Sequence, residues 1–170
     1  ETALETIEEK DFDKPTEIQK ESIPAIVEGK DVIAESATGS GKTLAFATGI
    51  IEKCDDSDHI NGVVLAPTRE LAKQVSSMVE ELSREKSINV LPIYGGVSIK
   101  PQIQKLKKAD VVVGTPGRML DHLRRGTMDL SQVDIFVLDE ADRMLDMGFI
   151  DDVEKIMDKT PRDKQHVFAS

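Results

Sequence analysis

Cysteine is nearly absent from this 170-residue sequence, which contains Cys54 and no other. A single cysteine excludes an intrachain disulfide and a zinc site built from several cysteines. Because such cysteine use is typical of reducing compartments, we expect a cytoplasmic or nuclear location. Long hydrophobic runs are lacking as well. No stretch approaches the roughly 20 apolar residues that a bilayer-spanning helix requires, so we expect no membrane partner.

The length and composition fit one globular domain over residues 1–170. Hydrophobic residues make up 39% of the chain and charged residues 32%, which excludes a disordered, collagen-like or coiled-coil protein. The sequence begins with Glu1 and Thr2, without an initiator Met or a signal-peptide pattern. We therefore expect a piece excised from a longer protein.

The net charge of −10 argues at first against a nucleic-acid partner, because phosphate contacts need a local excess of Lys and Arg. The charge is unevenly distributed, however. Residues 60–119 carry nine basic and five acidic residues, whereas residues 120–170 carry seven basic and twelve acidic ones. Any surface for a polyanion should therefore come from the middle of the chain.

Short β-branched runs alternate with stretches of helical composition along the whole chain. Strands are expected at Val32–Ala34, Val63–Ala66, Val90–Tyr94, Val111–Val113, Ile135–Leu138 and Val167–Ala169. Helices are expected at Lys42–Lys53, Glu70–Lys86, Pro101–Lys108, Arg118–Arg124 and Ile150–Lys159. The strands are apolar at consecutive positions, as in a sheet covered on both faces. This order predicts an α/β fold with a mostly parallel sheet flanked by helices on both faces.

A glycine-rich loop follows the first expected strand and leads directly into a helix. It consists of Ser36, Ala37, Thr38, Gly39, Ser40, Gly41, Lys42 and Thr43. Successive backbone N–H groups of such a loop converge on a phosphate, Lys42 adds a positive charge, and the Thr43 hydroxyl can hold Mg²⁺. Ser36 stands where Gly is common. The alternative is an ordinary glycine turn at a helix start, but strand, loop, Lys and Thr together favour a phosphate loop.

Two acidic residues, Asp139 and Glu140, follow the apolar strand at Ile135–Leu138. Open α/β sheets bind ligands at the carboxyl ends of their strands. There Asp139 would hold Mg²⁺ and Glu140 would orient or deprotonate a water molecule, which makes Lys42, Asp139 and Glu140 the candidate catalytic residues. Acids after a strand also commonly cap the next helix.

The segment Asp139-Glu140-Ala141-Asp142 resembles the signature of the DEAD-box RNA helicases. Three further segments stand in that family's order and spacing: Pro67–Ala72, Gly95-Gly96 and Thr115–Arg118. Nearly the whole chain is similar to the first of the family's two RecA-like domains. The resemblance implies a RecA-like P-loop fold, ATP and Mg²⁺ as cofactors, and RNA as partner.

In this family, hydrolysis and duplex opening require a second RecA-like domain, which supplies arginines to the γ-phosphate. The resemblance assigns Asp142 and Ser170 to the coupling between the two domains. The isolated domain is therefore expected to bind ATP and RNA but to hydrolyse ATP hardly at all. We also expect it to be monomeric.

The segment 11–19 resembles the family's adenine-reading segment through Phe12 and Gln19, although Asp11 stands where Gly is usual. The family's upstream aromatic residue is not found in residues 1–10. A Gln amide can pair with adenine N6 and N7, and Phe12 could stack on the base. Thr16 and Gln19 also have the spacing of a helix capping box, and the two roles are compatible.

Three loops from the basic middle of the chain are the RNA candidates. Their residues are Pro67, Thr68, Arg69, Gly95, Gly96, Thr115, Pro116, Gly117 and Arg118. None of the loops has an interleaved aromatic residue, which favours contacts to the sugar-phosphate backbone and binding of any sequence. Taken singly, each loop is equally well a capped helix start.

Two other hypotheses for the function of the chain remain open. One is a DNA helicase or another P-loop NTPase, and the other is a non-enzymatic binding module.

Other residues are assigned no role in a site. His59, His122 and His166 lack the spacing of metal ligands. The methionines Met144, Met147 and Met157 are expected to fill gaps in the core.

Overall fold

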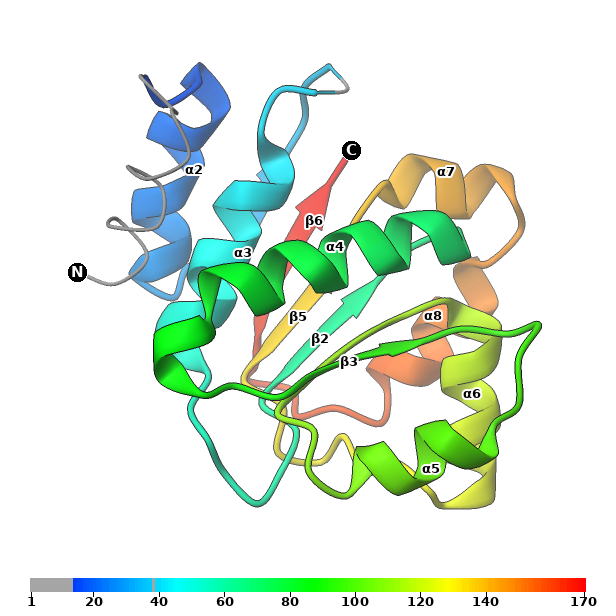
Figure 1. Cartoon of the computed structure of the whole chain (residues 1–170). Helices are drawn as coiled ribbons and strands as arrows, with labels where there is room; N and C mark the ends of the chain where they lie inside the picture. The colour runs from blue at the N-terminus through cyan, green and yellow to red at the C-terminus, as the bar shows by residue number, and fades with distance from the viewer. Residues whose placement is uncertain (1–13, 38) are drawn as a thin grey trace.

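The computed structural model describes residues 14–37 and 39–170, and Figure 1 shows the course of the chain. The helices are α2 (Glu17–Val27), α3 (Lys42–Lys53), α4 (Arg69–Leu82), α5 (Lys100–Leu106), α6 (Pro116–Arg125), α7 (Ala141–Asp146) and α8 (Ile150–Met157). The strands are β1 (Val32–Ala34), β2 (Gly62–Leu65), β3 (Val90–Ile93), β4 (Val111–Gly114), β5 (Ile135–Leu138) and β6 (Gln165–Ala169). Each predicted strand is confirmed to within two residues at either end.

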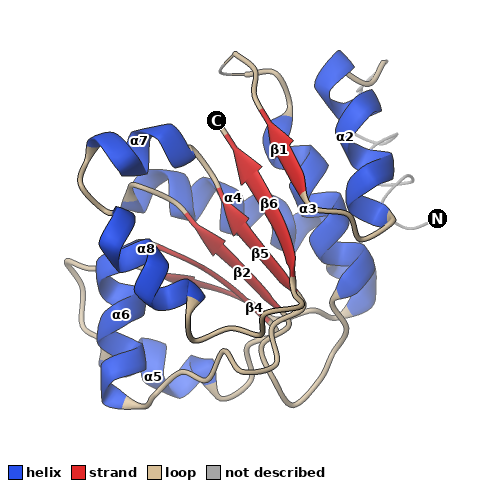
Figure 2. Ribbon diagram, turned by 180° about the vertical axis from the view of Figure 1, so that it is seen from behind, coloured by secondary structure: helices blue, strands red, loops and turns tan. Residues whose placement is uncertain are grey.

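The strands form one sheet in the order β1-β6-β5-β2-β4-β3, and every neighbouring pair is parallel. Parallel neighbours need crossover connections, which the intervening helices supply (Figure 2). The predicted α/β architecture is therefore confirmed, and the carboxyl ends of all six strands meet along one edge of the sheet.

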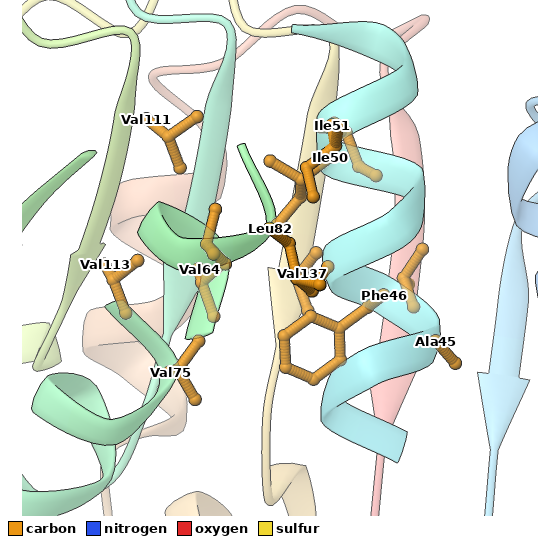
Figure 3. Packing of buried hydrophobic residues seen from close by; sticks show 14 of the residues in the cluster. Ala45, Phe46, Ile50, Ile51, Val64, Val75, Leu82, Val111, Val113 and Val137 are labelled. Atoms are coloured by element: carbon orange, nitrogen blue, oxygen red, sulfur yellow. The ribbon is translucent and has the colours of Figure 1, made fainter. Parts of the chain in front are cut away.

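Two hydrophobic clusters cover the two faces of the sheet. On one face, α2, α3 and α4 bury side chains such as Phe46 against Val64 and Val137, as Figure 3 shows. On the other face, α5, α6 and α8 pack against residues such as Phe136. The central strands β2, β4 and β5 are buried along their whole length, which explains their continuous apolar sequences.

Two sequence predictions are wrong in detail, and one helix was not predicted. The helix expected at Glu70–Lys86 ends at Leu82 and is followed by a 3₁₀ turn, Arg84–Lys86. The chain turns there because the Ser83 hydroxyl bonds back to the carbonyl oxygen of Glu80 (3.2 Å). Helix α7 was not expected at all. Met144 is buried as predicted, but Met147 is 45% exposed and belongs to the surface.

A polar network closes the other edge of the sheet, where the strands begin. Asp110 is fully buried, and its carboxylate accepts hydrogen bonds from the backbone N–H groups of Ser57 (3.1 Å) and Asn89 (2.8 Å). Ser57 in turn donates to the side chain of Asn61 (2.9 Å). A buried carboxylate needs such donors, so this network fixes the loops that precede β2, β3 and β4.

The described part of the chain has no helix that is long and apolar enough to span a membrane.

Candidate functional site

The phosphate loop lies between β1 and α3, at the edge of the sheet where the strands end (Figure 1). Gly39 and Gly41 have φ values of +81° and +89°, a backbone region that favours glycine. Ser36 is not among the residues with positive φ, so a side chain is accommodated at this position without backbone strain. The glycines of this loop therefore stand where the backbone needs them.

Lys42, at the first turn of α3, lies against the loop. Its ammonium group donates to the carbonyl oxygen of Ser36 (2.6 Å) and to that of Ser170. Ser170 follows β6, which pairs with β1 in the sheet and so ends beside the loop that follows β1. The lysine thus occupies the loop itself, and would have to leave these carbonyl oxygens to reach a phosphate.

Helix α2 holds the loop from outside through Thr16 and Gln19. The Thr16 hydroxyl donates to the carbonyl oxygen of Ser40 (2.6 Å), and the Gln19 amide nitrogen donates to that of Gly41 (3.3 Å). A Cβ added to Gly41 would lie 2.9 Å from Cδ of Gln19, closer than real side chains approach one another. Glycine at position 41 therefore permits this contact.

The capping box predicted from the sequence is formed, because Gln19 Oε1 accepts from the backbone N–H of Thr16 (3.0 Å). Both ends of the buried Gln19 amide are thus engaged, one in the cap and one on the phosphate loop. The adenine role of Gln19 stays a prediction. Phe12 and Thr38 lie outside the described residues.

Asp139 follows β5 and is 4% exposed. Burial is the main cause that raises the pKa of this carboxyl group to about 6, and the neighbouring charge of Glu140 raises it further, while Lys42 lowers it. One carboxylate oxygen, Oδ2, is buried without a hydrogen-bond partner. A buried, unpartnered oxygen ligand is what a hard divalent cation would satisfy.

The residues present therefore fit Mg²⁺. Among residues 14–37 and 39–170 there is no group of three or more His, Cys, Asp or Glu side chains that could hold a metal ion. Magnesium does not need one, since it commonly binds one or two protein oxygens and completes its shell with phosphate and water. Asp139 and Thr43 are the protein groups for such a site.

Glu140 begins α7 in a left-handed conformation, with φ 51° and ψ 53°. A non-glycine residue in this region costs roughly 1–3 kcal/mol and is typical of functional sites. The Glu140 carboxylate accepts a hydrogen bond from the guanidinium of Arg143 (3.1 Å). Asp142, in the first turn of α7, is exposed.

The three candidate RNA loops come together because β2, β4 and β3 are neighbours. Backbone bonds join them: Ala66 donates to Gly114 (2.9 Å), and Thr115 donates to Ile93 (3.0 Å). Thr68 caps α4 by accepting from the N–H of Leu71 (3.2 Å). Thr68 is thus a helix cap, as the alternative interpretation of this loop predicted, and it also belongs to the candidate RNA loop.

The side chains of these loops differ in exposure. Pro67 and Pro116 are buried, so their rings shape the turns and do not face solvent. Gly95 and Gly117 are exposed, and a Cβ added to either would meet nothing within 4 Å. A ligand backbone could approach closely at both glycines.

Arg118 bridges two of the loops. Its guanidinium donates to the carbonyl oxygen of Val97 (2.9 Å) and to Oε1 of Gln102 (3.2 Å). Gln102 Oε1 also bonds with Nε2 of the fully buried His122 (2.9 Å). Because an amide oxygen can only accept, Nε2 of His122 is the donor in this contact. Burial lowers the pKa of His122, and the nearby charge of Arg118 lowers it further.

Sequence reasoning missed Gln102 and His122, and it missed Tyr94. The ring of Tyr94 lies under the guanidinium of Arg69, 4.8 Å from its centroid, and the ammonium group of Lys73 lies 5.2 Å from the same centroid. Tyr94 directly precedes Gly95-Gly96, which was the one available signal.

Comparison with known proteins agrees with this geometry. The family model described as DEAD/DEAH box helicase matches residues 16–170. A probable ATP-dependent RNA helicase of Methanocaldococcus jannaschii is 48% identical over 98% of this chain and 46% of its own length. The ATP-dependent RNA helicase CshA of Listeria monocytogenes is 46% identical over 100% of this chain and 33% of its own length. The chain thus spans half or less of the relatives it matches.

Two solved structures superpose on the fold. The crystal structure of a DEAD box protein from the hyperthermophile Methanococcus jannaschii has a TM-score of 0.96 and 47% identity, over 100% of this chain and 47% of that one. The structure of a hypothetical ATP-dependent RNA helicase from Sulfolobus tokodaii has a TM-score of 0.89 and 39% identity, over 99% and 49% of the two chains. The phosphate loop, the acidic residues after β5 and these matches lead to one conclusion: the chain belongs to the DEAD/DEAH box helicase family.

Proposed function

We propose that this chain is the Mg²⁺-ATP-binding and RNA-binding half of an ATP-dependent RNA helicase. The observation that carries the proposal is the unpartnered oxygen of the buried Asp139 carboxylate. It lies at the same edge of the sheet as the phosphate loop, where Lys42 contacts the carbonyl oxygens of Ser36 and Ser170. A phosphate-binding cation beside an unpartnered metal ligand is the minimum that nucleoside triphosphate binding requires.

The residues of the loop bind and orient the nucleotide. The N–H groups of Gly39 and Gly41 would bind the phosphates, and Lys42 would exchange its carbonyl partners for phosphate oxygens. Thr43 and Asp139 would hold Mg²⁺, which would neutralise phosphate charge. Glu140 accepts a proton from the attacking water or orients it.

The RNA backbone crosses the loops that follow β2, β3 and β4. Arg69 and Arg118 supply positive charge, and the exposed Gly95 and Gly117 permit close approach of the sugar-phosphate chain. Such contacts carry no sequence information, so the domain binds single strands of any sequence. Duplex opening and fast hydrolysis belong to this chain joined to the second RecA-like domain. A reducing, cytoplasmic or nuclear compartment is part of the same proposal.

The test is ATP titration of the 170-residue chain with and without Mg²⁺, followed by RNA-dependent hydrolysis with the second domain attached. We expect Mg²⁺-dependent ATP binding that Asp139→Asn removes. Lys53→Gln, a charge change at the far end of α3, is the matched control and should bind as the wild type does. Absence of Mg²⁺-dependent ATP binding by the wild-type chain would overturn the proposal.

A further inference from the structure

The aromatic side chain of Tyr94 lies beside the candidate RNA loops. It is half-buried at the end of the edge strand β3, where two cations from α4 lie close to its ring. The carbonyl oxygen of Tyr94 accepts a hydrogen bond from the amide nitrogen of Gln102 (3.0 Å). Because Gln102 also binds Arg118, the position of Tyr94 is fixed by the same network that holds the other loops.

The two cations beside the ring come from successive turns of one helix. Arg69 and Lys73 are four residues apart on α4, and such residues lie on one face with Cβ atoms about 5–6 Å from each other. Two like charges this close repel, whereas the face of an aromatic ring attracts both. The ring of Tyr94 therefore offsets part of the repulsion and holds both side chains toward the end of β3.

Neither cation is neutralised within the part of the chain that the structure describes. The ion pairs found between residues 14–37 and 39–170 include neither Arg69 nor Lys73. Lys73 and Gly96 are exposed, and a Cβ added to Gly96 would be in van der Waals contact with Nη1 of Arg69 (3.5 Å). The guanidinium of Arg69 thus lies directly beside the exposed backbone of Gly96. Positive charge that is held in place but not paired is what an anionic ligand needs.

We propose that Arg69 and Lys73 form a phosphate clamp for single-stranded RNA and that Tyr94 is its positioning residue. Lys73 then contacts a phosphate of the RNA, and the RNA path extends along the first two turns of α4 beyond the three loops. Tyr94 contributes through the cations and not by stacking on a base, because its ring is already engaged by them. The inference rests on the proposed RNA-binding function and adds a binding residue and a positioning residue to it.

The first experiment measures RNA affinity against salt concentration, by fluorescence anisotropy with an oligouridylate and an unrelated single strand. Each phosphate contact to single-stranded nucleic acid contributes about 0.7 to the slope of log affinity against log salt. Lys73→Gln should weaken binding to both strands and reduce the slope by about 0.7. Lys108→Gln, the same charge change at an exposed residue just before β4, should leave the slope unchanged.

The second experiment separates the ring from its hydroxyl group. Tyr94→Phe keeps the aromatic face and should bind RNA as the wild type does. Tyr94→Leu removes the face and should weaken binding by roughly 2- to 5-fold for each cation released. Circular dichroism during urea unfolding compares the folding of the variants, so that a loss of affinity in a folded Tyr94→Leu chain reports on the clamp.

The outcomes distinguish this inference from the function on which it rests. If the wild-type chain binds no RNA even at low salt, both fail. If the wild type binds with a clear salt slope but Lys73→Gln behaves like Lys108→Gln, only the clamp is refuted. Equal loss in Tyr94→Phe and Tyr94→Leu refutes the positioning role of the ring.

Discussion

Asp139 should destabilise the metal-free fold at neutral pH, and Asp139→Asn is the perturbation that tests this. The pKa of the buried carboxyl group is raised from 3.8 to about 6, chiefly by burial. A carboxyl group whose pKa is higher in the fold than in the unfolded chain does not affect stability at a pH below both values, where it is protonated in both states. At a pH above both values it lowers the free energy of unfolding by the full amount. The difference between a pKa of 3.8 in the unfolded chain and about 6 in the fold lowers the free energy of unfolding by about 3 kcal/mol at pH 7.5.

The gain on substitution is smaller than that cost, because the new amide brings its own unpartnered N–H group to the position of Oδ2. An unsatisfied buried donor costs about 1–3 kcal/mol. In EDTA, which keeps the protein free of metal, we therefore expect Asp139→Asn to increase the free energy of unfolding by about 1 kcal/mol at pH 7.5. At pH 5 the wild-type carboxyl group is mostly protonated when folded, and its cost falls to about 1.6 kcal/mol. The advantage of the variant should therefore decrease by about 1.4 kcal/mol.

Urea unfolding followed by circular dichroism measures both differences, at pH 7.5 and pH 5. Addition of Mg²⁺ and ATP should then reverse the order, because ligand binding to the folded wild type stabilises it by RT ln(1 + [L]/Kd). The reasoning is refuted if the stability difference between the two chains does not depend on pH, or if the variant gains as much stability from Mg²⁺-ATP as the wild type.

Four further predictions concern single side chains. Gln19→Ala should weaken binding of both ATP and GTP, because it releases the carbonyl oxygen of Gly41, and an adenine contact would add about 1–3 kcal/mol to the loss for ATP; equal losses in paired titrations would assign Gln19 to the loop alone. Arg69→Ala and Arg118→Ala should each weaken binding of unrelated RNA strands to a similar extent, and an anisotropy series that finds a strong sequence preference would contradict backbone contacts. Glu140→Gln should leave Mg²⁺-dependent ATP binding intact but lower turnover of the two-domain protein by roughly 10²–10⁴; loss of ATP binding instead would make Glu140 a metal ligand. His122 titrates below its usual pKa in the fold, so stability should fall as pH drops through the unfolded value near 6.5, and urea unfolding at pH 7.5 and 5.5 should show a smaller fall for His122→Gln.

The order of strands and helices was predictable because both signals are local. A strand buried on both faces, such as Val111–Gly114, is apolar at every position, and a glycine-rich loop before a helix is recognisable from eight residues. Helix α7 was missed because its six residues are too short for a periodic pattern. The chain there turns at Glu140 through a positive φ, which the sequence of a glutamate does not suggest.

The site was predictable only in part, for the same reason. The residues of each loop are contiguous and could be identified one loop at a time. The contacts between loops join positions far apart in sequence, such as Gln102 with Arg118 and Lys42 with Ser170. Only the full strand order β1-β6-β5-β2-β4-β3 brings such residues together, and no periodicity in the sequence specifies it.

The parallel sheet divides the molecule into two ends that should tolerate mutation differently. At the end where strands begin, the buried Asp110 joins its own loop to two others through the backbone N–H groups of Ser57 and Asn89. Substitutions there, such as Asp110→Ala, remove folded protein while leaving the chemistry of each surviving molecule intact. At the other end, substitutions such as Lys73→Gln leave the amount of folded protein unchanged and alter what each molecule does. A mutational scan that records abundance and RNA binding separately would therefore resolve into two spatial classes, one at each edge of the sheet.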